Sequence, residues 1–219
     1  MSLKNKFKLT SIALASAVAM GAMTMPTTAS AELESSATLS SMYLWRGQDV
    51  SGGVPALSGD ITYSHSSGAY AFGWMSSESA SNVEVDLGLG YAGKVGPLEY
   101  DVSYYKYWYP EAGNPGEKLA DAGAEVVVAL TFKPVTVKAY LDAKDTNDYS
   151  YYTVSGSVGP VDLLYGISDS KTVNADYTHV DVTYNATDSL AFTVSKSSGD
   201  AVGFDSDPLF MMSYSLPVK

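Results

Sequence analysis

The chain is poor in histidine and cysteine, two side chains often used in acid–base and nucleophilic catalysis. It contains two histidines, His65 and His179, and no cysteine, which excludes thiol chemistry and a disulfide framework. His179 and Asp181 are two residues apart, so on a strand they share one face. A His–Asp pair can activate a water molecule or a serine. A structural hydrogen-bonded pair is the simpler interpretation, and we expect no catalytic residues and no enzymatic activity.

Two acidic segments raise the question of a metal site. Residues 142–148 (DAKDTND) and 199–208 (GDAVGFDSDP) offer carboxylates that suit Ca²⁺. Neither has the spacing of an EF-hand loop or its closing glutamate. Residues 88–93 (GLGYAG) lack the Lys-Ser/Thr of a phosphate-binding loop. A loop cation site stays open as an alternative to solvated acidic loops, but the sequence predicts no metal and no cofactor.

His179 and Asp181 lie in one of many segments with a period of two. In residues 83–93 (VEVDLGLGYAG), apolar side chains alternate with acidic or small ones, as in a strand with two unlike faces. Twelve such segments follow one another, with boundary errors of two to four residues. They cover residues 36–46, 55–65, 69–75, 83–93, 97–108, 123–132, 135–143, 151–159, 161–168, 177–185, 190–196 and 209–216.

The connections between these segments alternate between long and short. The first, third, fifth, seventh, ninth and eleventh are the longer ones, and the others are tight turns marked by Gly and Pro, such as KVG, KP and GP. In an antiparallel meander, alternate connections lie at opposite ends. An even strand number with short turns at one end and long loops at the other is typical of bacterial outer-membrane barrels. The sequence predicts an all-β, antiparallel transmembrane β-barrel of about twelve strands, with short periplasmic turns and longer external loops.

The apolar face of each strand can meet either lipid or a soluble core. Opposite it, the strands carry mainly Ser, Thr, Gly, Ala and acids, whereas a soluble sandwich usually carries many lysines there. Aromatic residues near the strand ends suggest the girdles at membrane interfaces. We assign to this lipid face Tyr43, Trp45, Tyr63, Tyr70, Trp74, Tyr91, Tyr152 and Tyr184. A soluble β-sandwich or calyx is the alternative.

If the apolar faces meet lipid, the charged residues of the strands point inward. The predicted pore-lining residues are Arg46, Asp60, Glu84, Asp86, Glu99, Asp101, Glu125, Lys138, Asp142, Asp162, His179 and Asp181. Carboxylates lining an aqueous lumen attract cations and repel anions. The sequence therefore favours a porin-like channel for passive diffusion of small polar solutes, with a weak preference for cations. The alternatives are a non-conducting structural or adhesive barrel and a soluble periplasmic ligand-binding β-protein.

The N-terminus has the features of a secretory signal peptide. Lysines at positions 4, 6 and 8 precede the uncharged residues 9–25, and ASA at 29–31 is a cleavage motif. The expected organisation is a signal peptide, residues 1–31, and a barrel, residues 32–219. Cleavage removes three lysines and no acid, so the remaining 188 residues have a formal charge of −14, which argues against nucleic-acid binding.

Residues 38–77 resemble the opening of a known bacterial family. The matching positions are Tyr43, Trp45, Arg46, Gly47, Pro55, Ala56, Leu57, Gly59, Tyr63, Gly68 and Trp74. On these residues the chain is identified as a member of the TorF or Gcw_chp family of outer-membrane porins. The resemblance implies location in the outer membrane of a Gram-negative cell and a transport role. The expected partners are outer-membrane lipid, the barrel-insertion machinery and small polar or cationic solutes.

Overall fold

The computed structural model describes residues 31–79, 82–110, 119, 122–144, 149–170, 176–199 and 206–216. Apart from Ala31, the expected signal peptide lies outside these residues, as do parts of both acidic segments. In the described part of the chain, no helix is long and apolar enough to cross a membrane.

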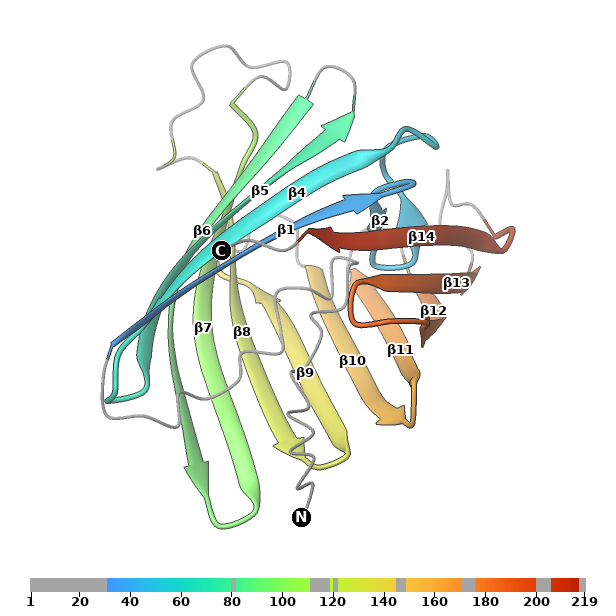
Figure 1. The fold of residues 1–219 in the computed structure, drawn as a ribbon. Helices are drawn as coiled ribbons and strands as arrows, with labels where there is room; N and C mark the ends of the chain where they lie inside the picture. Colours follow the sequence, from blue (N-terminus) through green and yellow to red (C-terminus); the bar gives the residue numbers. More distant parts are fainter. Residues whose placement is uncertain are drawn as a thin grey trace, which may run out of the picture.

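Twelve antiparallel strands form a closed barrel, which confirms the predicted fold class (Figure 1). Each wall strand pairs with the next along the chain, and the last strand, β14, pairs with β1 to close the wall. Two short strands, β2 (Leu44–Trp45) and β3 (Gln48–Asp49), form a separate hairpin between β1 and β4. The wall strands are β1 (Glu32–Ser40), β4 (Ala56–Ser64), β5 (Ala69–Ser79), β6 (Asn82–Val95), β7 (Leu98–Trp108), β8 (Gly123–Phe132), β9 (Val135–Asp142), β10 (Tyr149–Val158), β11 (Val161–Ser170), β12 (Tyr177–Asn185), β13 (Leu190–Gly199) and β14 (Leu209–Leu216).

The two ends of the barrel carry different connections. At one end, turns of two to four residues join β4 to β5, β6 to β7, β8 to β9, β10 to β11 and β12 to β13 (Figure 1). Gly96 and Gly159 have φ values of 59° and 61°, which suit tight hairpin turns. The opposite end carries longer connections, with one exception.

Two predicted boundaries at that end are wrong. The connection expected over residues 76–82 is short, because the β5–β6 ladder continues to Ser79 and Asn82 with a register shift after Ser77. The strand expected over residues 36–46 ends at Ser40, and the chain then turns into the barrel.

The barrel has an apolar outer face and a polar inner face. On β6, Leu89 is 66% exposed, whereas Glu84 and Asp86 are only 2% and 0% exposed. The same arrangement recurs around the wall, with exposed side chains such as Leu39, Leu57, Ile61, Val102, Leu130, Val137, Leu163, Val182, Val194 and Phe210. So large an exposed apolar belt is unfavourable in water but favourable in contact with the hydrocarbon chains of lipid. The chain is therefore a membrane-type β-barrel.

The prediction for the aromatic residues is correct for only half of the set. The outward-facing members are Tyr63, Tyr91, Tyr152 and Tyr184. Tyr43 and Trp45 instead lie in the inserted chain after β1. Tyr70 and Trp74 occupy the inner face of β5, where the Tyr70 hydroxyl donates to Asp101 Oδ2 at 2.7 Å. The outer face of β5 carries Ala, Gly and Met, so its phase is opposite to the predicted one.

An aromatic cluster fills part of the barrel interior. Its buried members are Tyr70, Phe72, Tyr105, Val127, Tyr140 and Tyr151. Phe72 packs edge-on against Tyr105, with ring centroids 4.7 Å apart. Two inward-facing glycines of β6 make room for this cluster, since a side chain at Gly88 would overlap the Phe72 ring and one at Gly90 the Tyr70 ring.

We expect Gly88→Ala to destabilise the barrel by about 1–3 kcal/mol, because the added methyl group overpacks this interior. A Cβ there would overlap Phe72 and would also lie 2.9 Å from the Tyr104 carbonyl oxygen. Guanidinium unfolding in detergent measures the change. Gly123→Ala on β8 is the control, because a Cβ there meets nothing within 4 Å. Equal effects of the two substitutions would contradict the explanation.

Candidate functional site: a hairpin inside the barrel lumen

The connection between β1 and β4 folds into the lumen as a small hairpin, residues 43–53, which we call the inserted hairpin. Leu44 pairs with Asp49 and Trp45 with Gln48, so Arg46 and Gly47 form its two-residue turn. Their φ values of 48° and 79° are those of a type I′ turn. Such a conformation is unfavourable for arginine, so its contacts must offset the backbone cost.

Arg46 fastens the tip of the inserted hairpin to one wall of the barrel. Its side chain is buried, and Nη2 donates to Glu125 Oε2 on β8 at 2.7 Å. The Tyr107 hydroxyl donates to the same carboxylate oxygen at 2.6 Å. The guanidinium carbon also lies 4.5–5.3 Å from the ring centroids of Trp45, Tyr140, Tyr149 and Tyr151. A charge-assisted hydrogen bond and several cation–π contacts hold this tip.

The backbone of the same turn is held by the opposite wall. Ser197 Oγ on β13 donates to the Gly47 carbonyl at 2.8 Å, and the Tyr177 hydroxyl on β12 donates to the Arg46 carbonyl at 2.9 Å. A side chain at Gly47 would overlap the His179 ring, so glycine is required by space as well as by its φ. The tip therefore spans the lumen from β8 to β12 and β13.

The base of the inserted hairpin is fixed by Tyr43 and Asp49. The Tyr43 hydroxyl donates to Glu84 Oε2 on β6 at 2.7 Å. Asp49 Oδ1 accepts from the Ser51 backbone N–H at 3.0 Å, and Asp49 Oδ2 accepts from the Gly53 N–H at 2.6 Å. These bonds give the hairpin a defined shape of its own.

His179 and Asp181 are brought together at the tip of the inserted hairpin. The second imidazole nitrogen of His179, however, contacts a tyrosine and not a serine. His179 Nδ1 lies 2.9 Å from Asp181 Oδ1, and the Tyr151 hydroxyl lies 2.6 Å from Nε2. Ser195 donates to Asp181 at 2.6 Å rather than to His179. In a Ser–His–Asp arrangement the serine contacts the other imidazole nitrogen. The His179 ring of this buried network packs against the Gly47 turn.

The remaining predicted lumenal residues lie apart from the hairpin tip. Asp101 and Lys138 fall in one row across β7, β8 and β9, through Ala129. Three carboxylates have local partners: Ser36 donates to Asp60, Asn185 to Asp162 at 2.6 Å, and the Lys144 backbone to Asp142 at 2.8 Å. Glu99 forms ion pairs with Lys94 at 3.4 Å and Lys133 at 3.2 Å near the short turns.

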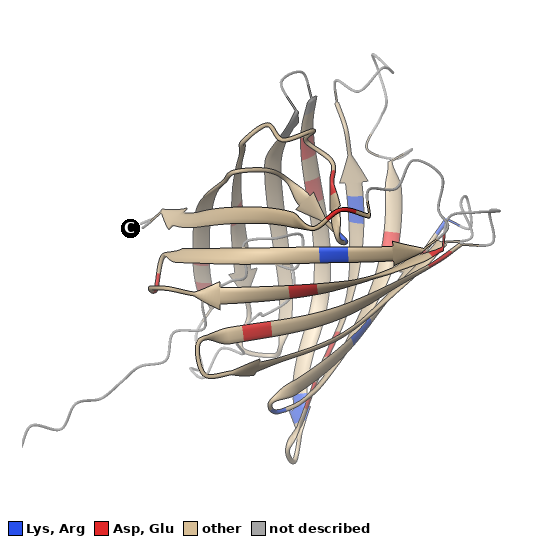
Figure 2. Ribbon diagram, turned by 90° about the vertical axis from the view of Figure 1, so that its right-hand side faces the viewer, with Lys and Arg blue, Asp and Glu red and all other residues tan. Residues whose placement is uncertain are grey.

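Among the predicted lumenal residues, Arg46 is placed differently from the others. It reaches the lumen from the inserted hairpin and not from a wall strand, so its assignment to the first strand is wrong. The tyrosines that surround Arg46, such as Tyr140 and Tyr151, were not among the predicted lumenal residues. Acidic positions are spread over many strands while basic ones are few (Figure 2).

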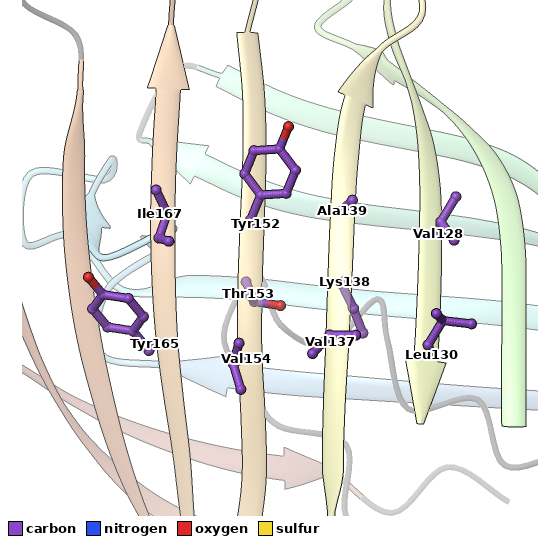
Figure 3. Close-up of a pocket in the computed structure, with 10 residues that line it drawn as sticks. All are labelled: Val128, Leu130, Val137, Lys138, Ala139, Tyr152, Thr153, Val154, Tyr165 and Ile167. Atoms are coloured by element: carbon purple, nitrogen blue, oxygen red, sulfur yellow. The ribbon is translucent and has the colours of Figure 1, made fainter. Parts of the chain in front are cut away.

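A shallow hollow of about 300 Å³ lies on β8–β11, and Figure 3 shows its lining. Six of its lining side chains are exposed on the outer face: Leu130, Val137, Tyr152, Val154, Tyr165 and Ile167. It therefore belongs to the lipid-facing belt and is not an entrance to the lumen.

Fold and interior together define a membrane-type β-barrel with an inserted hairpin. Residues 24–196 match the model of a family described as "Bacterial protein of unknown function (Gcw_chp)". The chain belongs to this family, which confirms the resemblance found in the sequence. A comparison with curated proteins found no match.

Solved structures give distant likenesses. A mutant of Rh. blastica porin is 14% identical with a TM-score of 0.43, over 74% of this chain and 55% of the porin. The chain therefore spans about half the length of that porin. Outer membrane phospholipase A from Escherichia coli is 10% identical with a TM-score of 0.45, over 85% of this chain and 91% of that chain. The strand pairing of this chain by itself defines the closed twelve-stranded wall.

Proposed function

We propose that the protein is a porin-like channel of the outer membrane, through which small polar solutes diffuse with a preference for cations, and that the inserted hairpin sets the width of the passage. The observation that carries the proposal is the lumenal surface of β6 and β8. It bears three carboxylates, Glu84, Asp86 and Glu125, which we call the acidic wall.

Charge explains the expected preference. Arg46 pairs with one of these three carboxylates, Glu125, so carboxylates outnumber the arginine on this wall. These carboxylates are buried while the hairpin is inserted. In the narrow polar passage that opens when the hairpin moves, such an excess concentrates cations and repels anions. A structural barrel needs no acidic excess in its interior, and buried carboxylates destabilise it unless they are compensated.

The test is conductance of the purified protein in a planar bilayer with a salt gradient. We expect a cation-selective reversal potential. The double variant Glu84→Gln/Asp86→Asn should move this potential most of the way toward zero, because it removes the two carboxylates of the acidic wall with which Arg46 does not pair. Glu34→Gln, at an exposed position near the start of β1, is the control and should leave it unchanged.

Two outcomes would count against the proposal. Anion selectivity would contradict the role of the acidic wall while keeping the channel. A folded barrel that never conducts, even after the hairpin is released as described in the Discussion, would favour the non-conducting structural barrel. Heat-dependent mobility on gels, together with circular dichroism, shows that each preparation is folded.

A further inference from the structure

Two buried polar side chains on the lumenal face of β5 and β6 have no hydrogen-bond partner. Asp86 is 0% exposed, and neither of its carboxylate oxygens accepts a hydrogen bond. Ser76 is 2% exposed, and its hydroxyl is likewise unpartnered. Buried polar groups are almost always paired, so two orphans on adjacent strands need a physical reason.

The orphans lie beside a second carboxylate. Ser76 is directly opposite Glu84 in the β5–β6 ladder, and Glu84 and Asp86 are two residues apart on the same face of β6. Glu84 accepts from the Tyr43 hydroxyl at 2.7 Å and from the Tyr109 hydroxyl at 2.8 Å. These two hydroxyl donors hold the Glu84 carboxylate on the lumenal side of β6.

The inserted hairpin does not provide a cationic partner for Asp86. Its arginine, Arg46, donates to Glu125 on β8, two strands away from Asp86. The charged neighbours that act on Asp86 are Glu84 and Glu125, both acidic. An ionised carboxylate buried among like charges is costly, and a bound cation removes that cost.

We propose that Asp86, Glu84 and Ser76 bind a divalent cation of the Ca²⁺ type. A divalent ion at this position takes an oxygen ligand from each of the two carboxylates and from the Ser76 hydroxyl, and its charge favours the ionised form of Asp86. Ca²⁺ accepts carboxylate and hydroxyl oxygens in irregular geometry and completes its shell with water. No group of three or more His, Asp or Glu side chains able to hold a metal occurs within the part of the chain that the structure covers. The site therefore has two acidic ligands, and we expect a Kd on the order of 10⁻⁴–10⁻³ M, as in weak calcium sites.

The position of Trp74 provides a direct probe. Trp74 is directly opposite Asp86 in the β5–β6 ladder. Tb³⁺ replaces Ca²⁺ at oxygen sites and luminesces when a nearby indole is excited. We expect the folded protein in detergent to sensitise Tb³⁺ emission, and Ca²⁺ to displace it. Trp74→Phe should lower the emission but leave Ca²⁺ binding, measured by calorimetry, unchanged.

Variants of the ligands test the assignment. Asp86→Asn keeps the shape of the side chain and should weaken Tb³⁺ and Ca²⁺ binding at least tenfold, and Ser76→Ala should weaken it several-fold. Asp162→Asn is the matched control, because that carboxylate also faces the lumen but already accepts from Ser157 and Asn185. It should bind both ions as the unaltered protein does.

The result that overturns the proposal is equally direct. Absence of Ca²⁺ heat and of Tb³⁺ emission in the folded protein would show that the pair holds no cation. Full binding by folded Asp86→Asn would place the ion elsewhere, for example on the external loops. Because binding is measured in detergent without conduction, its failure is distinguishable from failure of the proposed channel.

Discussion

Replacing Arg46 with alanine should free the inserted hairpin from the lumen and raise the single-channel conductance several-fold. The substitution removes the ion pair with Glu125 and the contacts with four aromatic rings. Breaking one partner of a buried ion pair costs about 3–5 kcal/mol, mainly because the other charge stays buried and unpaired. The turn also loses the side chain whose contacts offset its left-handed backbone. Conductance in a planar bilayer measures the change.

Two variants control for charge and for geometry. Lys94→Ala removes the same charge near a short turn, where the lysine is exposed, and should not alter conductance. Arg46→Lys keeps the charge but loses the planar guanidinium that stacks on the rings, so we expect an intermediate conductance. If folded Arg46→Ala conducts like the unaltered protein, the hairpin does not control the passage.

The second large effect concerns the outer face. Leu89→Arg should destabilise the barrel in lipid vesicles by about 2–4 kcal/mol, because it puts a charge at mid-depth in the hydrocarbon. Leu89 is exposed and lies near the middle of β6, between Ala71 on β5 and Tyr104 on β7. In a soluble protein the same change at an exposed site would be nearly neutral. Guanidinium unfolding in vesicles therefore separates the two environments.

A second arginine substitution, placed nearer the membrane interface, is the control. Leu98→Arg makes the same chemical change at the first residue of β7, beside the short turn at Gly96. Near the interface its cost should fall to about 0–1 kcal/mol. Equal costs at positions 89 and 98 would contradict a membrane-spanning wall and favour the soluble alternative.

The wall of the barrel could be predicted from the sequence because each strand carries its own signal. In β6 the alternation from Val83 to Tyr91 sets the face of every residue, and a slip of one residue would expose Glu84 and Asp86 to lipid. Turn residues such as Gly96 and Gly159 mark the strand ends. These local signals suffice for an antiparallel meander in which neighbours in sequence are neighbours in space.

The phase of β5 could not be set by the same reasoning. Tyr70, Phe72 and Trp74 alternate with Ala, Gly and Met, so both faces are apolar and the pattern is ambiguous. The aromatic side chains of β5 point inward for two reasons. The Tyr70 hydroxyl donates a hydrogen bond to Asp101, and Gly88 and Gly90 on β6 leave space for the rings. Both reasons lie on other strands.

The inserted hairpin was missed for a related reason. Residues 43–46 continue the alternation of β1 and were predicted as its end. Their true position depends on Glu125, Tyr151 and Ser197, which come from three distant strands. The adjacent Arg46 and Gly47 were the available signal, since a two-residue turn with glycine second is a hairpin pattern.

The stems of the inserted hairpin join two strands that already lie side by side. Ser40 at the end of β1 pairs with Ala56 at the start of β4, below the hairpin. The wall is therefore complete without residues 43–53, and moving them breaks no hydrogen bond between two wall strands. A form with the hairpin withdrawn would differ from this one by the contacts of those few residues, so each 1.4 kcal/mol added to or removed from these contacts would change the ratio of the two forms about tenfold.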